Sequence, residues 1–170
     1  MLQDLKECFD LTPVKVDLKK AQAEGPRLME KLVELGKSGT AFAMVLPGGK
    51  GYYLTLKSKE AIRREMAEDL HPEIAALDVS LLHEYIIPQV WVGNPEMEFD
   101  DHDIFYVKDA GEALKMLGAP TFASAVFLMN APTVEQVRTI AMKNLRMPHK
   151  STYFYPKLLT GMVLRDHTVA

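Results

Sequence analysis

The stretch TAFAMVLPGGKGYYLTLK, residues 40–57, decides the fold of this chain. Its first part, Thr40–Leu46, is a short apolar run with the length of a buried strand, and Tyr52–Lys57 has the residue types of a second strand. Between them, Pro47–Gly51 combines proline with glycines, a composition typical of a tight turn. Two strands joined in this way predict an antiparallel hairpin.

Upstream of the hairpin, the apolar pattern predicts a short helix over Leu2–Leu11 and a β-compatible stretch at Val14–Val16. A longer helix follows. Gly25–Pro26 would open it with proline at the first helical position, leucines three to four residues apart would line one face, and Gly36 would end it.

Downstream, Ser58 is placed to cap a helix, and Asp78 is placed to cap another. Pro88 is expected to stop or kink that second helix, because a proline inside a helix removes one backbone hydrogen bond. The acidic stretch Glu96–Asp103 is expected to be an exposed connection.

The last third of the chain has a β-α-β-α rhythm. Ile104–Val107 is predicted as a short strand, and Asp109 begins a capping box for a helix that Gly118 ends. Phe122–Met129 is nearly all apolar, which is typical of a strand covered on both faces. Thr133 begins a second capping box and helix.

Together these elements predict an α/β fold, with α+β as the alternative, in a single domain over residues 1–170. The expected sheet is mixed: it contains the antiparallel hairpin and the carboxy-terminal β-α-β-α segment, with a final strand at Gly161–Leu164 and with helices packed on the sheet. The 170 residues include 48% apolar and 25% charged ones, the composition of an ordinary globular protein.

Charge and cysteine content exclude several classes of protein. The 20 basic and 23 acidic residues give a net charge of −3, which weighs against nucleic acid as a partner. Cys8 is the only cysteine, so neither an intrachain disulfide nor a cysteine-rich zinc site can form. The amino terminus lacks the pattern of a signal peptide, and no apolar run reaches the roughly 18 residues of a membrane span. We therefore expect a cytoplasmic protein without a membrane partner.

Three motifs are weak on inspection. His83-Glu84 begins like a zinc-protease helix, but Ile87 stands where the second histidine belongs, so His83 is interpreted as structural. Asp100–Asp103 lacks the glycine and terminal glutamate of a calcium loop and is interpreted as solvated charge. Gly48–Gly51 is followed by a strand rather than a helix, which favours a hairpin turn over a phosphate-binding loop. No metal site is predicted.

The loop Asn130–Thr133 is a stronger candidate for binding. It joins a predicted strand to the amino terminus of a helix, where free backbone N–H groups and the helix dipole favour an anion. Capping of the helix by Thr133 alone is the simpler interpretation, because every helix needs its first donors satisfied.

The densest cluster of polar and charged side chains lies between Lys150 and Lys157. Two ammonium groups enclose hydroxyl donors, a set that can hold phosphate or carboxylate. The chemistry is equally consistent with a surface loop that its aromatic side chains anchor to the core. The candidate anion ligands of the chain are Lys150, Ser151, Thr152, Tyr153, Tyr155, Lys157, Asn130 and Thr133.

Three segments carry a resemblance to a known family: LDVSLLHE (residues 77–84), FLMNAPTVEQV (127–137) and MPHKSTYFYPKLLTG (147–161). They resemble the bacterial and archaeal family called domain of unknown function 1015. The resemblance runs from the Leu5 region to about Leu164 and covers the carboxy-terminal half of the family pattern. Full-length members carry an Asp-Gly-His-His-Arg-Tyr motif in their other half, similar to one in partition-protein-like folds, some of which are nucleotide-dependent serine kinases.

This resemblance implies one half of a small-molecule phosphotransferase, inactive alone because the motif is absent here. It implies a nucleotide or pyrophosphate, with Mg²⁺, as ligand of the full-length protein, and the amino-terminal half or a second copy of the chain as partner. A non-enzymatic interaction module is the alternative, and partition-protein-like binding of nucleic acid is a weaker one. The chain is expected to be either a fragment or a naturally separate protein.

Overall fold

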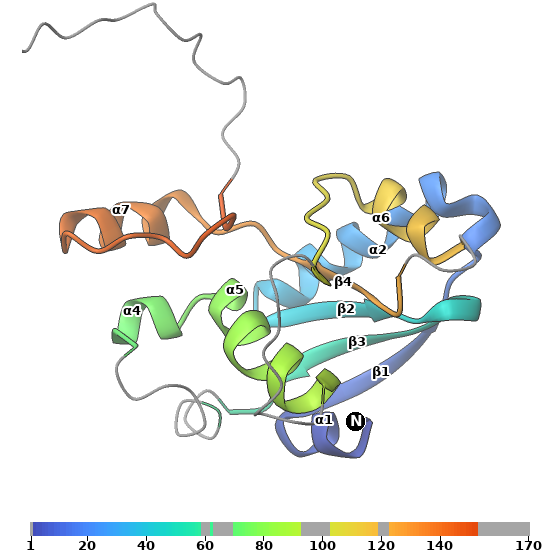
Figure 1. Cartoon of the computed structure of the whole chain (residues 1–170), viewed down its shortest axis with the longest axis horizontal. Helices are drawn as coiled ribbons and strands as arrows, with labels where there is room; N and C mark the ends of the chain where they lie inside the picture. Colours follow the sequence, from blue (N-terminus) through green and yellow to red (C-terminus); the bar gives the residue numbers. More distant parts are fainter. Residues whose placement is uncertain (1, 59–61, 63–69, 93–102, 119–122, 153–170) are drawn as a thin grey trace, which may run out of the picture.

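A computed structural model describes residues 2–58, 62, 70–92, 103–118 and 123–152. The chain is an α/β protein built on a four-stranded sheet in the order β1-β3-β2-β4 (Figure 1). The strands are β1 (Phe9–Lys15), β2 (Ala41–Val45), β3 (Lys50–Leu56) and β4 (Val126–Met129). The helices are α1 (Leu2–Cys8), α2 (Ala21–Gly36), α4 (Pro72–Ala75), α5 (Asp78–Leu81), α6 (Ala110–Gly118) and α7 (Val134–Met142), with the 3-10 turns η1 (Leu18–Lys20) and η2 (Pro47–Gly49) and the π-helix η3 (Leu82–Val92).

The predicted hairpin is confirmed. β2 and β3 pair antiparallel from Ala41 opposite Thr55 to Val45 opposite Gly51. The turn between them holds Gly49 at φ +79°, and a Cβ on this residue would overlap the carbonyl oxygen of Val16. Glycine is therefore required both for the turn and for the close approach of the chain after β1.

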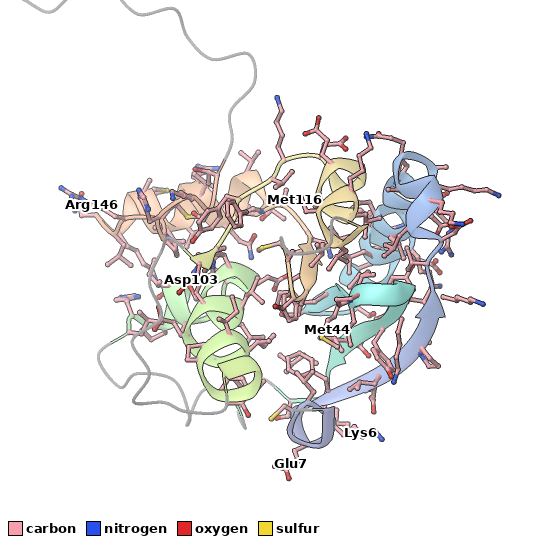
Figure 2. The ribbon with its side chains drawn as sticks, turned by 45° about the vertical axis from the view of Figure 1, so that its right-hand side comes forward. Lys6, Glu7, Met44, Asp103, Met116 and Arg146 are labelled. Carbon is pink, nitrogen blue, oxygen red and sulfur yellow. The ribbon has the colours of Figure 1, made fainter. Side chains whose placement is uncertain are left out.

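One face of the sheet packs against α1, α5 and η3. Strand residues alternate between the two faces, so Phe9, Phe42, Met44 and Leu54 share this one. Met44 lies between the sheet and these helices (Figure 2). The remaining buried members of this first core cluster come from α1, residue 62, α5 and η3: Leu5, Ile62, Leu81, Leu82, Tyr85, Ile86 and Ile87.

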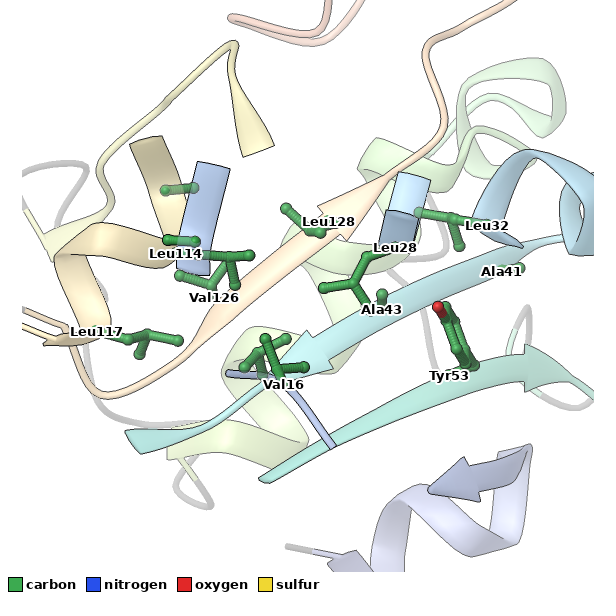
Figure 3. Packing of buried hydrophobic residues seen from close by; sticks show 13 residues of the cluster. Val16, Leu28, Leu32, Ala41, Ala43, Tyr53, Leu114, Leu117, Val126 and Leu128 are labelled. Carbon is green, nitrogen blue, oxygen red and sulfur yellow. The ribbon is translucent and has the colours of Figure 1, made fainter. Parts of the chain in front are cut away.

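The opposite face packs against α2 and α6. Here Ala41, Ala43 and Leu128 meet leucines of the two helices in a second core cluster (Figure 3). Tyr53 belongs to this cluster, and burial raises the pKa of its hydroxyl, an effect that the charge of Arg27 partly offsets. Because both faces are covered, the apolar character of β2 and β4 is explained.

Two element boundaries near the amino terminus differ from the prediction. α1 ends at Cys8, and β1 begins at Phe9, because this stretch pairs with β3 from Phe9 opposite Leu56 onward. α2 begins at Ala21, so Pro26 lies inside the helix instead of opening it. Tertiary packing decides this start, since the buried Gly25 contacts the backbone of Gly111 in α6.

The carboxy-terminal part of the chain contains fewer strand residues than the sequence predicts. Residues 104–107 form no strand, so the prediction for Ile104–Val107 was wrong; Phe105 there is 56% exposed. β4 covers only Val126–Met129 and pairs antiparallel with β2. All pairings in the described residues are antiparallel, so the parallel part expected of a mixed sheet is not among these strands.

Two predictions about helix ends, a stop or kink at Pro88 and a cap at Asp78, have different outcomes in the structure. Pro88 lies within η3, where the wider π-helical turn accommodates a missing N–H, so it does not end the helix. The N-cap of α5 is Leu77, so Asp78 is the first residue of the helix and not its cap; its carboxylate accepts a hydrogen bond from the Thr40 hydroxyl (2.8 Å). The helix expected after Ser58, apart from residue 62, and the strand at Gly161–Leu164 lie outside the described residues.

In the described ranges, we find no helix with the length and apolar character that a bilayer crossing requires.

Candidate functional site

The segment after α7 folds back along that helix and ends in a tight turn over Pro148–Ser151. Leu145 and Met147 pack beside Ile140 of α7, which holds the segment in place. The backbone N–H and the hydroxyl of Ser151 both donate to the carbonyl of Pro148, at 3.3 and 2.6 Å. The turn requires Lys150 at φ +54°, a left-handed conformation that is unfavourable for lysine by about 1–2 kcal/mol.

This turn brings Lys150 to an aromatic ring from another part of the chain. The Lys150 ammonium lies 4.5 Å from the ring centroid of Tyr106. The Tyr106 ring stacks on His83, with centroids 5.8 Å apart and planes 16° apart. We call these three residues the cation-aromatic stack. Its members come from η3, from the connection before α6 and from the turn after α7.

The stack combines one lysine charge with two aromatic rings. A lysine over an aromatic ring gains about 0.5–1 kcal/mol at an exposed position and keeps its charge available to a ligand. The Tyr106 and His83 rings lie beside it. Tyr106 is 38% exposed, and the flanking Phe105 and Val107 are exposed as well, so a ligand can reach the stack and meet apolar surface beside it.

Two of the other predicted anion ligands, Thr133 and Asn130, have structural roles. The Thr133 hydroxyl accepts from the Gln136 N–H (3.2 Å), and the Gln136 side chain accepts from the Thr133 N–H (2.7 Å), so the predicted capping box is confirmed. The Asn130 amide donates to the carbonyl of Leu32 in α2 (3.2 Å). These hydrogen bonds connect Asn130 to α2 and Thr133 to the first turn of α7, and none of them involves a member of the cation-aromatic stack.

A small cavity lies beside Asn130. Its volume is about 20 Å³, and Asp78, Pro132 and Gln136 are among its lining residues. The Asn130 Oδ1 atom is buried without a hydrogen-bond partner from the described residues. A space of this size holds one water molecule and is too small for a phosphate group.

Replacing Thr133 by alanine should lower the free energy of unfolding by about 1 kcal/mol, because the first turn of α7 loses its side-chain cap. Urea unfolding of both variants measures this. The matched control is Thr139→Ala inside the same helix, where alanine has the higher helix propensity and stability should not fall to the same extent. Equal losses in the two variants would contradict the capping role.

The remaining predicted anion ligands are Thr152, Tyr153, Tyr155 and Lys157. Thr152 is exposed directly after the turn, whereas Tyr153, Tyr155 and Lys157 lie outside the described residues. Sequence reasoning missed Tyr106 and assigned His83 a purely structural role. No local pattern could have identified this pair, because His83 and Tyr106 are 23 positions apart (106 − 83) and only the tertiary fold stacks them.

Neither a metal-binding group in the described residues nor a similar known protein identifies further residues of the site. Within the part of the chain that the structure describes, no three histidine, cysteine or acidic side chains are grouped to hold a metal ion. No family model, no curated protein and no solved structure matches this chain.

Proposed function

We propose that this chain binds a small phosphate-bearing anion, a nucleotide or pyrophosphate, at the cation-aromatic stack. It does so as one half of a phosphotransferase-like protein and is inactive alone, because the acid- and histidine-containing motif of the resembled family is absent. The observation that carries the proposal is the Lys150 ammonium held 4.5 Å from the Tyr106 ring centroid.

Three features support an anion at this place. The strained backbone of Lys150 is retained although it is unfavourable, and residues held in such conformations cluster at functional sites. π-Helical segments, such as the one that carries His83, also occur frequently at functional sites. Phosphoryl transfer depends mainly on positioning and charge neutralisation, which a fixed lysine supplies. In the complete protein, Mg²⁺ would accompany a nucleotide.

The test is binding of pyrophosphate and ATP, with and without Mg²⁺, measured by calorimetry and thermal shift. The Lys150→Ala variant should bind about tenfold more weakly, since one charge close to the ligand is lost. Tyr106→Ala should weaken binding as well, because the ammonium loses its support. Lys37→Ala, an exposed lysine at the end of α2, is the charge-matched control and should bind as the unaltered chain does.

Unchanged affinity in Lys150→Ala would remove the proposal. The experiment is best run on this chain and on the protein reconstituted with the amino-terminal half. If the site needs both halves, the ligand-dependent rise in melting temperature appears only in the reconstituted protein.

A second candidate function is a non-enzymatic interaction module that completes the amino-terminal half or a second copy of the chain. The exposed apolar run Phe105, Tyr106 and Val107 favours it. This function predicts a thermal shift on addition of the partner and none with pyrophosphate. Binding of nucleic acid would instead weaken steeply with salt, and the net charge of −3 argues against it.

A further inference from the structure

A second surface feature lies at the hairpin end of the sheet. A hollow of about 370 Å³ is lined by residues 13–15 of β1 and 48–52 of the turn and β3. We call it the hairpin hollow. In Figure 1 the tip of the hairpin lies away from α1 and α5, which pack on the other end of the same sheet face. The volume is within the range of small-molecule sites.

Two lysines at directly opposite positions on β1 and β3 line this hollow. Lys15 of β1 pairs directly with Lys50 of β3, so both side chains project from the same sheet face. Among the described residues neither makes an ion pair, and no acidic side chain lines the hollow. Like charges directly opposite each other destabilise a sheet, and a bound anion would relieve this repulsion.

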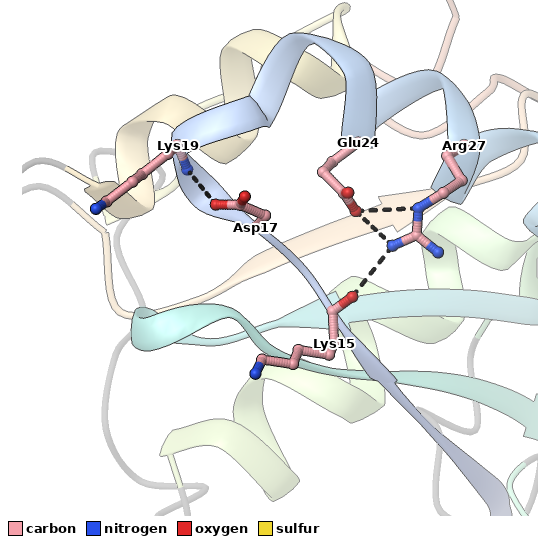
Figure 4. A network of polar contacts seen from close by, with 5 residues as sticks. All are labelled: Lys15, Asp17, Lys19, Glu24 and Arg27. Atoms are coloured by element: carbon pink, nitrogen blue, oxygen red, sulfur yellow. Dashed lines mark hydrogen bonds and ion pairs between the residues drawn. The ribbon is translucent and has the colours of Figure 1, made fainter.

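The fold holds this pair rigidly. Gly49 allows the turn to approach Val16, whose N–H donates to the Gly49 carbonyl at 2.9 Å, and this contact continues the pairing next to Lys15. On the other side, the Arg27 guanidinium donates to the Lys15 carbonyl (3.1 Å) and pairs with Glu24 of α2 (Figure 4). The Lys15 side chain leads away from Arg27 in Figure 4, so this network fixes the Lys15 backbone through its carbonyl and does not engage its ammonium.

The rest of the lining is apolar or aromatic. Pro13 and Tyr52 lie opposite each other two pairs further along the strands, and so on the same face as the two lysines. The Lys50 ammonium lies 5.6 Å from the Tyr52 ring centroid, so charge and ring are presented together. A ligand that matches this surface has a flat or apolar body and one anionic group.

We infer that the hairpin hollow binds a small organic anion, with its phosphate or carboxylate between Lys15 and Lys50 and its apolar body against Tyr52 and Pro13. The inference is independent of the function proposed for the cation-aromatic stack, because the two sites share no residue. An aryl phosphate is the simplest ligand that carries both chemical features.

The test is an NMR titration of the full chain with phenyl phosphate, inorganic phosphate and phenol. Phenyl phosphate should shift the amide signals of Gly48–Gly51 and Lys15 and bind more tightly than either component. Lys15→Ala and Lys50→Ala should each weaken it about fivefold, equivalent to about 1 kcal/mol for one nearby charge. Lys37→Ala, an exposed lysine at the end of α2 that lies in neither site, is the charge-matched control and should leave the binding unchanged.

A measurement without ligand tests the premise. Lys50→Ala should raise the melting temperature slightly, because it removes the repulsion from Lys15. The inference is overturned if phenyl phosphate moves no amide signal in the hollow, if phenol or inorganic phosphate alone binds equally well, or if both lysine variants bind phenyl phosphate with full affinity.

Discussion

The Phe42→Ala variant is expected to lose about 3–5 kcal/mol of unfolding free energy, the usual cost of removing a buried aromatic ring from a packed core. Phe42 is 0% exposed and lies on β2, which has a partner strand on each side. Its ring meets Phe9 edge to face, with centroids 6.2 Å apart and planes at 71°. Urea or thermal unfolding followed by circular dichroism measures the loss.

The matched control is Phe105→Ala, the same substitution at a position that is 56% exposed. It should cost much less, because little apolar area returns to water. A loss below about 1 kcal/mol in Phe42→Ala would contradict the first core cluster. The same cluster contains Leu82, Tyr85 and Ile86 of η3, so Phe42→Ala should also loosen the helix that carries His83 and weaken anion binding at the stack.

Gly25→Ala is expected to destabilise the protein although helix propensity alone predicts a gain of about 1 kcal/mol. An alanine Cβ at this position would lie 2.5 Å from the backbone nitrogen of Gly111 and 2.9 Å from the carbonyl carbon of Ala110. Backbone atoms cannot change rotamer, so α2 and α6 must separate. We expect a net loss of about 1–3 kcal/mol in unfolding free energy, as for other overpacked sites.

Ala23→Gly calibrates this result. Ala23 is exposed on the same helix, and its replacement by glycine should cost about 1 kcal/mol through propensity alone. A stabilised Gly25→Ala variant, together with the expected loss in Ala23→Gly, would show that α2 and α6 do not meet at Gly25. Destabilisation in both variants agrees with the described packing of the second core cluster.

The candidate site was only partly predictable from the sequence. The cluster at Lys150 was identified by its density of charges and hydroxyl groups, and the structure places Lys150 in the cation-aromatic stack. The role of Tyr106 could not be predicted, because its segment has strand-like residues and was predicted as part of the sheet. Among the described residues the sheet ends with β1 on one side and β4 on the other, and residues 104–107 pair with neither strand.

Local signals also could not separate structural from functional use of a polar side chain. Thr133 was correctly expected to cap α7, because a capping box depends only on four consecutive residues and can be recognised in the sequence. The role of Asn130, which donates to α2 from the end of β4, depends on a contact across 98 positions. The opposed lysines of the hairpin hollow likewise follow from the pairing register of β1 and β3, which the sequence did not reveal.

The amino-acid sequence by itself determined the β2–β3 hairpin, the long helix that ends at Gly36 and the capped start of α7. Turn residues, apolar periodicity and caps act over a few neighbouring positions, so their effects can be predicted from the sequence. Only the tertiary structure decided that β1 and β4 flank the hairpin, that α2 begins before its proline, and that His83, Tyr106 and Lys150 meet. These outcomes depend on which distant surfaces bury each other, and the free energy of that burial outweighs the local preferences of the segments involved.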